Sequence, residues 1–259
     1  SMPARFDHAV VVVPSLKRAV RSFERLGFDV VMGGRTGPAH NALILFNGGT
    51  YIELTTNRFS ILRPLFRGLN ASGVMAHAAA GRSDMLHRFL PLIGAPQGAI
   101  DWCIRVDDVR ATVRRLRDAG VEMVDEMAFE RERPDGQVAK WLLAGPRDVR
   151  LPFFIEDLTP VEIRVPFREH SAHPNGVTGI QRIVLPNDAK IALEQVLGTV
   201  LRDGPDSLGN LIASRSKRVD AEPPGRFALE LVRPASGDEA LDPAHTFGVS
   251  ITLVGDGLT

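Results

Sequence analysis

The sequence predicts an α+β fold built from a strand–helix–strand–strand–strand unit that occurs twice and then recurs in degraded form. Two helix-like segments, residues 15–30 and 108–123, carry apolar residues at the same helical spacing. Each has a capping side chain at its start and a glycine near its end. A strand-like run precedes each helix, and further strand-like runs follow it. The spacing of the two copies exceeds that of solenoid repeats, which indicates a duplicated domain.

The first unit is expected over residues 4–56. Residues 6–13 form an apolar run that is typical of a strand. The helix that follows is predicted to begin after Ser15, whose hydroxyl suits an N-cap, and to end near Gly27 in a left-handed C-cap. Its apolar stripe consists of Leu16, Val20, Phe23 and Leu26.

The second unit is expected over residues 98–158, with its first strand at residues 100–106. Asp108 and Gly120 occupy the two helix-capping positions. The matching apolar stripe consists of Val109, Val113, Leu116 and Ala119. Residues 57–97 between the units are longer than an ordinary connection and are predicted to form a helical insert. Together, residues 4–158 form the predicted two-unit domain.

A linker over residues 159–178 is predicted to lead to a third, degenerate unit over residues 179–255. Residues 179–185 resemble a first strand, and residues 188–197 a short helix that ends at Gly198. Residues 227–232 and 247–253 alternate as strands do. Arg182 stands where the first copy has His8, so no metal site is expected in this unit.

Composition argues against several classes of partner. The 259 residues contain 31 basic and 31 acidic side chains, and this zero formal charge argues against nucleic acid or an anionic membrane as the main partner. Cys103 is the single cysteine, which excludes a disulfide framework and fits a reducing compartment. No secretory leader or membrane-length apolar segment is seen, so a cytoplasmic protein is expected.

His8 and Glu53 are the leading candidate site residues. In a strand, side chains two positions apart share a face, so His8 points the same way as Val10, and Glu53 the same way as Tyr51. An imidazole and a carboxylate on the inner faces of two strands can bind a divalent metal. The alternative is a hydrogen-bonded core histidine and a solvated glutamate.

Several motifs occur together in a fixed order along the chain. They are Asp-His-Ala-Val at residues 7–10, Leu-Gly-Phe at 26–28, Tyr-Ile-Glu-Leu at 51–54, Arg-Pro-Asp-Gly at 133–136, Leu-Pro-Phe-Phe-Ile-Glu at 151–156 and His-Pro-Asn-Gly at 173–176. In this pattern, which covers about two-thirds of the chain, the sequence resembles the vicinal-oxygen-chelate superfamily, and within it the glyoxalase-like domain group. The resemblance implies paired βαβββ units that form a cupped, barrel-like mixed sheet around a cavity. It also implies metal ligands at His8, at Glu53 and at the matching positions of the second unit.

The second unit departs from the pattern of that superfamily. Opposite His8 it has Trp102, which cannot ligate a metal. Glu156 aligns with Glu53 if Phe-Ile-Glu is set against Tyr-Ile-Glu, but a shift of one or two residues would place Phe154 there instead. Glu53 or Glu156 is the expected catalytic base.

Further residues are candidates for binding the substrate. His40 lies at the entry to a predicted strand, and Arg133 precedes an Asp-Gly turn in a predicted hairpin. Trp102, Trp141 and Phe154 would give the second half an aromatic lining. The alternatives are an exposed loop for His40, a solvated hairpin charge for Arg133 and ordinary core packing for the three aromatic residues.

The expected function is that of a small-molecule enzyme of the glyoxalase-like kind. The resemblance implies a divalent metal (zinc, manganese, nickel or iron) and lyase or isomerase chemistry on an oxygen-chelating substrate. The alternative is a non-catalytic protein, similar to bleomycin-resistance proteins, that sequesters an apolar or aromatic ligand. The expected partner is a small molecule. The sequence does not decide between a monomer and a homodimer.

Overall fold

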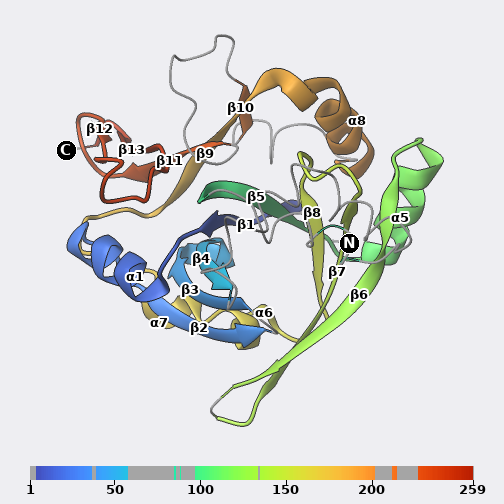
Figure 1. Cartoon of the computed structure of the whole chain (residues 1–259), viewed down its shortest axis with the longest axis horizontal. Helices are drawn as coiled ribbons and strands as arrows, with labels where there is room; N and C mark the ends of the chain where they lie inside the picture. Colours follow the sequence, from blue (N-terminus) through green and yellow to red (C-terminus); the bar gives the residue numbers. More distant parts are fainter. Residues whose placement is uncertain are drawn as a thin grey trace.

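The computed structural model describes residues 4–36, 39–57, 85, 88, 97–133, 135–201, 212–214 and 227–258. Within these ranges the strands form an eight-stranded sheet and a five-stranded sheet, with helices packed on them (Figure 1). This confirms the predicted α+β class.

Both predicted units are present, and each has the order βαβββ. The first consists of β1 (Arg5–Val12), α1 (Leu16–Arg25), β2 (Val31–Thr36), β3 (Ala39–Leu45), the 3₁₀ helix η1 (Asn47–Gly49) and β4 (Tyr51–Asn57). The second consists of β5 (Gly98–Arg105), α5 (Val109–Asp118), β6 (Met123–Glu132), β7 (Val138–Pro146) and β8 (Phe153–Asp157).

Local hydrogen bonds explain where the two long helices of these units begin. The Ser15 side chain accepts from the Arg18 N–H, and the Asp108 side chain accepts from the Ala111 N–H. Just beyond the helix ends, Gly27 has φ +90° and Gly120 has φ +87°. Glycine adopts this left-handed conformation without steric cost, so both helices end where the sequence predicts.

The two units join through their first strands into one curled sheet. The strand order is β2-β3-β4-β1-β5-β8-β7-β6, so β1 and β5 lie side by side at the centre, and they run antiparallel. At the edges, the Arg131 guanidinium on β6 donates to the Gly33 carbonyl on β2 at 2.5 Å. The two edge strands of the sheet therefore approach each other, and the sheet forms a cup (Figure 1).

The two faces of this sheet bury different residues. One face packs under the helices, in a hydrophobic cluster that includes Phe23 of α1, Trp102 of β5 and Val113 of α5. The other face lines the cup, in a smaller cluster that includes Cys103, Trp141, Leu143, Phe153 and Ile155. Strand alternation accounts for this division, because Trp102 and Cys103 are adjacent and point to opposite faces.

The segment after the second unit contains α6 (Val161–Arg164) and α7 (Phe167–His170). It is fixed to the first unit by His173, which accepts from the Asp29 N–H at 3.0 Å and donates to the Leu45 carbonyl at 2.7 Å. Asn175 then donates from its side chain to the Leu26 carbonyl at 3.1 Å, at the end of α1. The predicted linker is therefore an ordered crossing over the first unit.

The C-terminal part adds a second sheet. It contains β9 (Gly179–Leu185), the 3₁₀ helix η4 (Asn187–Ala189), α8 (Lys190–Val200), β10 (Ile212–Ser214), β11 (Ala228–Arg233), β12 (Glu239–Ala240) and β13 (Ile251–Gly255). The strand order is β10-β9-β11-β13-β12. Ile183 and Leu229 belong to the same hydrophobic cluster as Phe23 and Trp102, so this part covers the helix side of the first sheet (Figure 1).

Two boundaries in this part differ from the sequence prediction. Helix α8 continues through Gly198 to Val200, because Val196 and Val200 are both buried and their packing outweighs the low helix propensity of glycine. Strand β13 begins at Ile251, not at Phe247. Phe247 and Gly248 have φ values of 56° and 83°, which do not fit an extended strand.

Of the predicted helical insert over residues 57–97, most lies outside the described residues. Met85 and Arg88 are described; both are helical and fully buried. In the described part of the chain, no helix is long and apolar enough to cross a membrane.

Candidate functional site

The site begins with an irregularity in β1. Phe6 pairs with Ile104 and His8 pairs with Cys103, so Asp7 is an extra residue that forms a β-bulge. A bulge changes the direction of the side chains at its position. Here it lets two consecutive side chains meet, with His8 Nδ1 2.6 Å from Asp7 Oδ2.

His8 and Glu53, which the sequence analysis proposed as metal ligands, lie in contact. The distance from His8 Nε2 to Glu53 Oε2 is 3.4 Å. The Asn41 side-chain amide donates to the other oxygen, Glu53 Oε1, at 3.1 Å. His8 is 4% exposed, whereas the Glu53 side chain is 20% exposed, so Glu53 lies on the open side of the pair.

This donor set fits a bound cation. An ionised Asp7 can only accept a hydrogen bond, so His8 Nδ1 donates to it and Nε2 carries the lone pair in the neutral ring. A lone pair and a carboxylate oxygen then face each other and need a proton or a metal ion between them. Two ligand atoms about 2.0–2.1 Å from a tetrahedral zinc ion would lie roughly 3.3–3.4 Å apart, which matches the observed separation.

Two aromatic rings hold the His8 imidazole in place. The Tyr51 ring stacks on it with centroids 4.5 Å apart and planes inclined by 8°. The Phe153 ring meets it edge-on at 5.5 Å. Contacts of this geometry fix the plane of the imidazole as well as its position.

Asp7 also contacts two arginines from distant segments. Arg105 of β5 bonds Asp7 Oδ1 through its Nε at 2.7 Å. Arg164 of α6 donates to Asp7 Oδ1 at 3.1 Å and to Asp7 Oδ2 at 3.3 Å. Arg164 also donates to both oxygens of Asp157, at 2.6 and 3.0 Å, and to the Tyr51 hydroxyl at 2.9 Å. Two guanidinium groups and two carboxylates therefore form a buried, charge-balanced network behind His8.

This network determines the protonation of its members. Burial alone would raise the pKa of Asp7, but the charge of Arg164, the hydrogen bond from His8 and the charge of Arg105 hold it well below its ordinary value. Burial raises the pKa of the Tyr51 hydroxyl well above its ordinary value, even though the charge of Arg164 opposes this shift. Asp7 is therefore a carboxylate and Tyr51 a neutral phenol at neutral pH.

A local two-fold relationship connects the two units. Three pairs of matching positions are separated by 93 residues: Ser15 and Asp108, Gly27 and Gly120, and the directly paired Ala9 and Trp102. With the same shift, His8 corresponds to Asp101 and Val10 to Cys103.

The strand pairing then identifies the counterpart of Glu53. Val10 pairs with Glu53 in β4, and its equivalent Cys103 pairs with Phe153 in β8, so Phe153 is the counterpart of Glu53.

The alignment made from the sequence is therefore displaced. It set Trp102 against His8, and Glu156 or Phe154 against Glu53, but a slip of one residue in a strand turns a side chain to the other face. Trp102 and Phe154 are 1% and 0% exposed and belong to the cluster on the helix side of the sheet. Of the true counterparts, Asp101 is bound by Arg88 at 2.9 and 3.1 Å, and Phe153 has no ligating atom.

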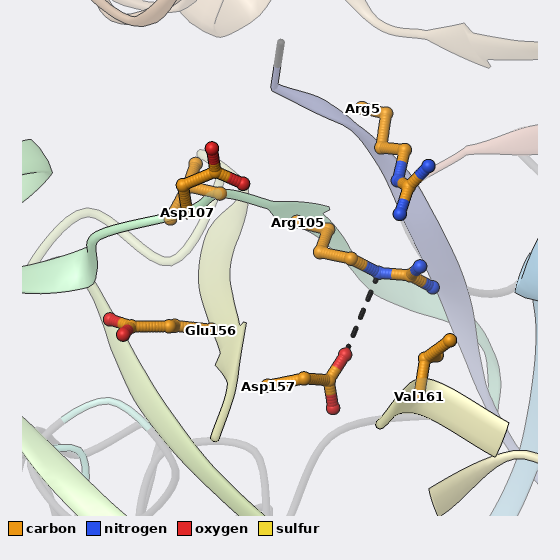
Figure 2. Close-up of a pocket in the computed structure, with 7 residues that line it drawn as sticks. Arg5, Arg105, Asp107, Glu156, Asp157 and Val161 are labelled. Atoms are coloured by element: carbon orange, nitrogen blue, oxygen red, sulfur yellow. Dashed lines mark ion pairs between the residues drawn. The ribbon is translucent and has the colours of Figure 1, made fainter. Parts of the chain in front are cut away.

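Glu156 also lies away from His8. Its Oε2 accepts from the Val109 N–H at the start of α5, at 2.8 Å. Figure 2 shows Glu156 and Asp157 extending to opposite sides of β8, with Asp157 directed at Arg105. Both residues border a separate pocket of about 220 Å³ next to the buried network, lined by Arg5, Arg105, Val106, Asp107, Glu156, Asp157 and Val161.

The remaining predicted residues lie at different places. Trp141 is on the cup side, 7% exposed, and its ring stacks on Phe129 at 6.2 Å. Arg133 is at the predicted hairpin, where it pairs with Asp135 at 3.0 Å and donates to the Glu162 carbonyl at 3.3 Å. His40 belongs to β3, where its backbone pairs with Thr56, and its side chain lies outside the described part of the structure.

Asp7, His8 and Cys103 form a further group, with ligand atoms within 4.8 Å of one another. Asp7 is already bound by two arginines and by His8 Nδ1. Burial raises the pKa of the Cys103 thiol well above its ordinary value, and the charge of Asp7 adds to this shift. The open side of the histidine is therefore Nε2, toward Glu53.

Sequence reasoning missed Asp7, Asn41, Tyr51 and Arg164 as parts of the site. One signal was present, since Asp7 is an acidic residue inside an apolar strand, directly before His8. Buried carboxylates require partners, so Asp7 predicts nearby cations, although not which ones.

The chain belongs to the family of the glyoxalase-like domain, whose model matches residues 6–201. This confirms the resemblance inferred from the motifs. No curated protein is significantly similar to the chain in sequence.

Solved structures show the same fold. A hypothetical protein from Staphylococcus aureus is similar with a TM-score of 0.67 at 16% sequence identity, over 97% of this chain and 99% of that one. The Mn(II)-bound glyoxalase from Novosphingobium aromaticivorans is similar with a TM-score of 0.50 at 9% identity, over 98% of this chain and 82% of that one.

Proposed function

We propose that the protein is a divalent-metal-dependent enzyme of lyase or isomerase type that acts on a small, oxygen-chelating substrate. The observation that carries the proposal is the 3.4 Å approach of His8 Nε2 to Glu53 Oε2, with Asp7 on the other ring nitrogen. Its family, and the manganese in the glyoxalase of similar fold, support the proposal.

In this proposal, His8 Nε2 and Glu53 Oε2 hold the metal. A divalent metal bound there would polarise a substrate carbonyl as a Lewis acid. Asp7 keeps the imidazole in the tautomer that presents Nε2, and Asn41 orients Glu53 through Oε1.

Glu53 is also the proposed base, because its carboxylate lies on the open side of the site. Because Oε2 cannot hold an ion and accept a proton at the same time, Glu53 would act as the base only once the substrate oxygens had displaced its carboxylate, and it would then accept the proton from the substrate carbon next to those oxygens. Glu156 is not assigned this role, because its carboxylate accepts the Val109 N–H on the helix side of the sheet.

The direct test is metal analysis of protein purified without chelator. About one equivalent of metal is expected in the wild type and in His245→Ala, a control that removes an exposed histidine. His8→Ala and Glu53→Gln are expected to lose it. If the metal is lost during purification, titration of the protein with Zn²⁺, Mn²⁺, Ni²⁺ and Fe²⁺ restores it. The proposal fails if none of these ions binds, or if His8→Ala binds them as the wild type does.

A second candidate function is metal-free sequestration of an apolar or aromatic ligand. The second unit favours this function, because it offers no metal ligands at the matching positions. Phe153 stands in place of Glu53, and Asp101, the counterpart of His8, is bound by Arg88. Such a protein would show ligand-dependent quenching of fluorescence from Trp141 on the cup side, and Trp141→Phe would abolish it. Quenching in protein that binds no metal would favour this function over the enzyme.

A further inference from the structure

We propose that Arg131 binds an anionic group of the ligand, so that the site takes a small carboxylate with an apolar or aromatic portion. The inference deepens the proposed function, because it names the class of substrate for the same site.

Arg131 extends across the cup. In β6 it alternates with Phe129, which packs against the cup-side cluster, so both side chains share that face. The guanidinium donates to the Gly33 carbonyl of β2 at 2.5 Å and to the Arg164 carbonyl of α6 at 2.7 Å. It also lies over the Trp141 ring, 5.9 Å from the ring centroid.

The charge of Arg131 is not neutralised by a direct partner. Arg88, Arg105 and Arg164 are each paired with a buried carboxylate. For Arg131, no carboxylate among the described residues lies within the 4.0 Å that defines an ion pair. Its two hydrogen bonds go to backbone carbonyls and leave three of the five donors of a guanidinium for a ligand.

Glu53, the carboxylate whose charge acts on Arg131, is already engaged by other residues. The charge of Glu53 acts on Arg131, which places the guanidinium near the His8–Glu53 pair. Glu53, however, directs Oε2 at His8 and Oε1 at Asn41. Burial lowers the pKa of Arg131, but an arginine stays charged in proteins, so a half-buried cation faces the site.

This arrangement defines the chemistry of the ligand. A single uncompensated guanidinium suits a monoanion, and its planar fork matches a carboxylate. The neighbouring Trp141 and Phe129 rings, with centroids 6.2 Å apart, offer an apolar surface beside the charge. A carboxylate with an adjacent oxygen and an aromatic group would therefore contact Arg131, the rings and the His8–Glu53 pair together.

The test compares an acid with its neutral ester. Benzoylformate and methyl benzoylformate carry the same ring and ketone and differ in the carboxylate charge. Calorimetric titration of metal-free protein with each probe gives the preference for the acid. We expect a preference of at least about tenfold in the wild type, the size of one good charge-assisted contact.

Arg131→Met is expected to abolish the preference, and Arg131→Lys to restore part of it while keeping a positive charge. Arg110→Met is the matched control, because Arg110 of α5 is an exposed arginine that pairs with Glu126 of β6, the strand that carries Arg131. Thermal unfolding shows whether Arg131→Met still folds. If it does not, Arg131→Lys decides: a reduced preference for the acid supports the inference, and a preference equal to that of the wild type contradicts it.

Three outcomes overturn the inference: equal binding of acid and ester by the wild type, an undiminished preference in a folded Arg131→Met variant, or loss of the preference in Arg133→Met alone. Because the titration uses metal-free protein, it is independent of the metal analysis. A preference for the acid in a protein that binds no metal would retain the ligand class and refute the metal enzyme.

Discussion

Arg164 donates to both carboxylate oxygens of Asp7, although 157 positions separate the two residues in the sequence. Arg105 donates to the same carboxylate. Asp157 accepts from Arg164, so that two carboxylates balance the charges of the two arginines. Asp7 is thus a fixed charge that orients His8, while Glu53 on the open side has only Asn41 and His8 as described polar partners.

The depressed pKa of Asp7 predicts a pH dependence of stability. Because the folded-state pKa lies below the ordinary 3.8, the stabilisation is complete above about pH 4 and is lost as the pH falls below that value. Urea unfolding between pH 7 and 2 is expected to show the free energy of unfolding of the wild type falling more steeply with acid than that of Asp7→Asn. The difference between the two curves should narrow steadily as the pH falls from about 4 to 2, and parallel curves would contradict the assignment.

Removal of one partner from the buried network is predicted to cost more than removal of an exposed ion pair. Arg164→Met leaves Asp7 and Asp157 with one guanidinium, so a loss of about 3–5 kcal/mol in the free energy of unfolding is expected. Arg168→Met, which breaks an exposed pair with Glu162, is expected to cost about 0–1 kcal/mol.

A double-mutant cycle with Asp7→Asn isolates the Arg164–Asp7 interaction. The double variant should lose about 0.5–3 kcal/mol less than the sum of the two single losses. Additive losses would show that Arg164 stabilises the fold without acting on Asp7.

Gly33 is predicted to be essential for the position of Asn41. A Cβ at this position would overlap Asn41 Oδ1 and lie 3.2 Å from Leu43 Cγ, so Gly33→Ala should displace the amide that holds Glu53. A loss of about 10–100-fold in Zn²⁺ affinity by calorimetry is expected, with a stability cost of about 1–3 kcal/mol. Gly179→Ala in β9 adds a Cβ into open space and serves as the control. An unchanged affinity in Gly33→Ala would remove Asn41 from the site.

Cys103 is predicted to be unreactive in the folded protein. The thiol is fully buried, and burial together with the charge of Asp7 raises its pKa. Since it is the only cysteine, an Ellman assay at pH 8 should report almost no thiol in native protein and one per chain in guanidinium chloride. Rapid reaction of the native protein would mean that the cup opens at β5.

The parts of the fold that the sequence predicts are those encoded by neighbouring residues. Ser15 and Asp108 cap their own helices, and the glycines beyond them adopt left-handed conformations, so both helices can be read locally. The end of α8 cannot, because the buried Val200 keeps the helix intact beyond Gly198 through tertiary packing.

The site was predictable to the extent that strand alternation holds. Alternation brings His8 and Glu53 to one face, and the structure places them in contact. It fails at Asp7, where a bulge interrupts the pattern, and in the second unit, where a shift of one residue exchanges Trp102 for Asp101 or Cys103. Arg164 carries no local signal, because its partner lies at the other end of the two-unit domain.

The distance in sequence between Asp7 and Arg164 also sets the order in which the site can mature. During synthesis, Asp7 and His8 leave the ribosome well before Arg164, whose guanidinium completes the neutralisation of Asp7 and follows more than 150 residues later. A carboxylate buried without its counter-ions is strongly destabilising, so the nascent first unit keeps Asp7 hydrated until α6 has emerged. Asp7 and His8 are therefore synthesised long before they reach their final geometry, and a nascent chain stalled before residue 164 would hold His8 without its complete support.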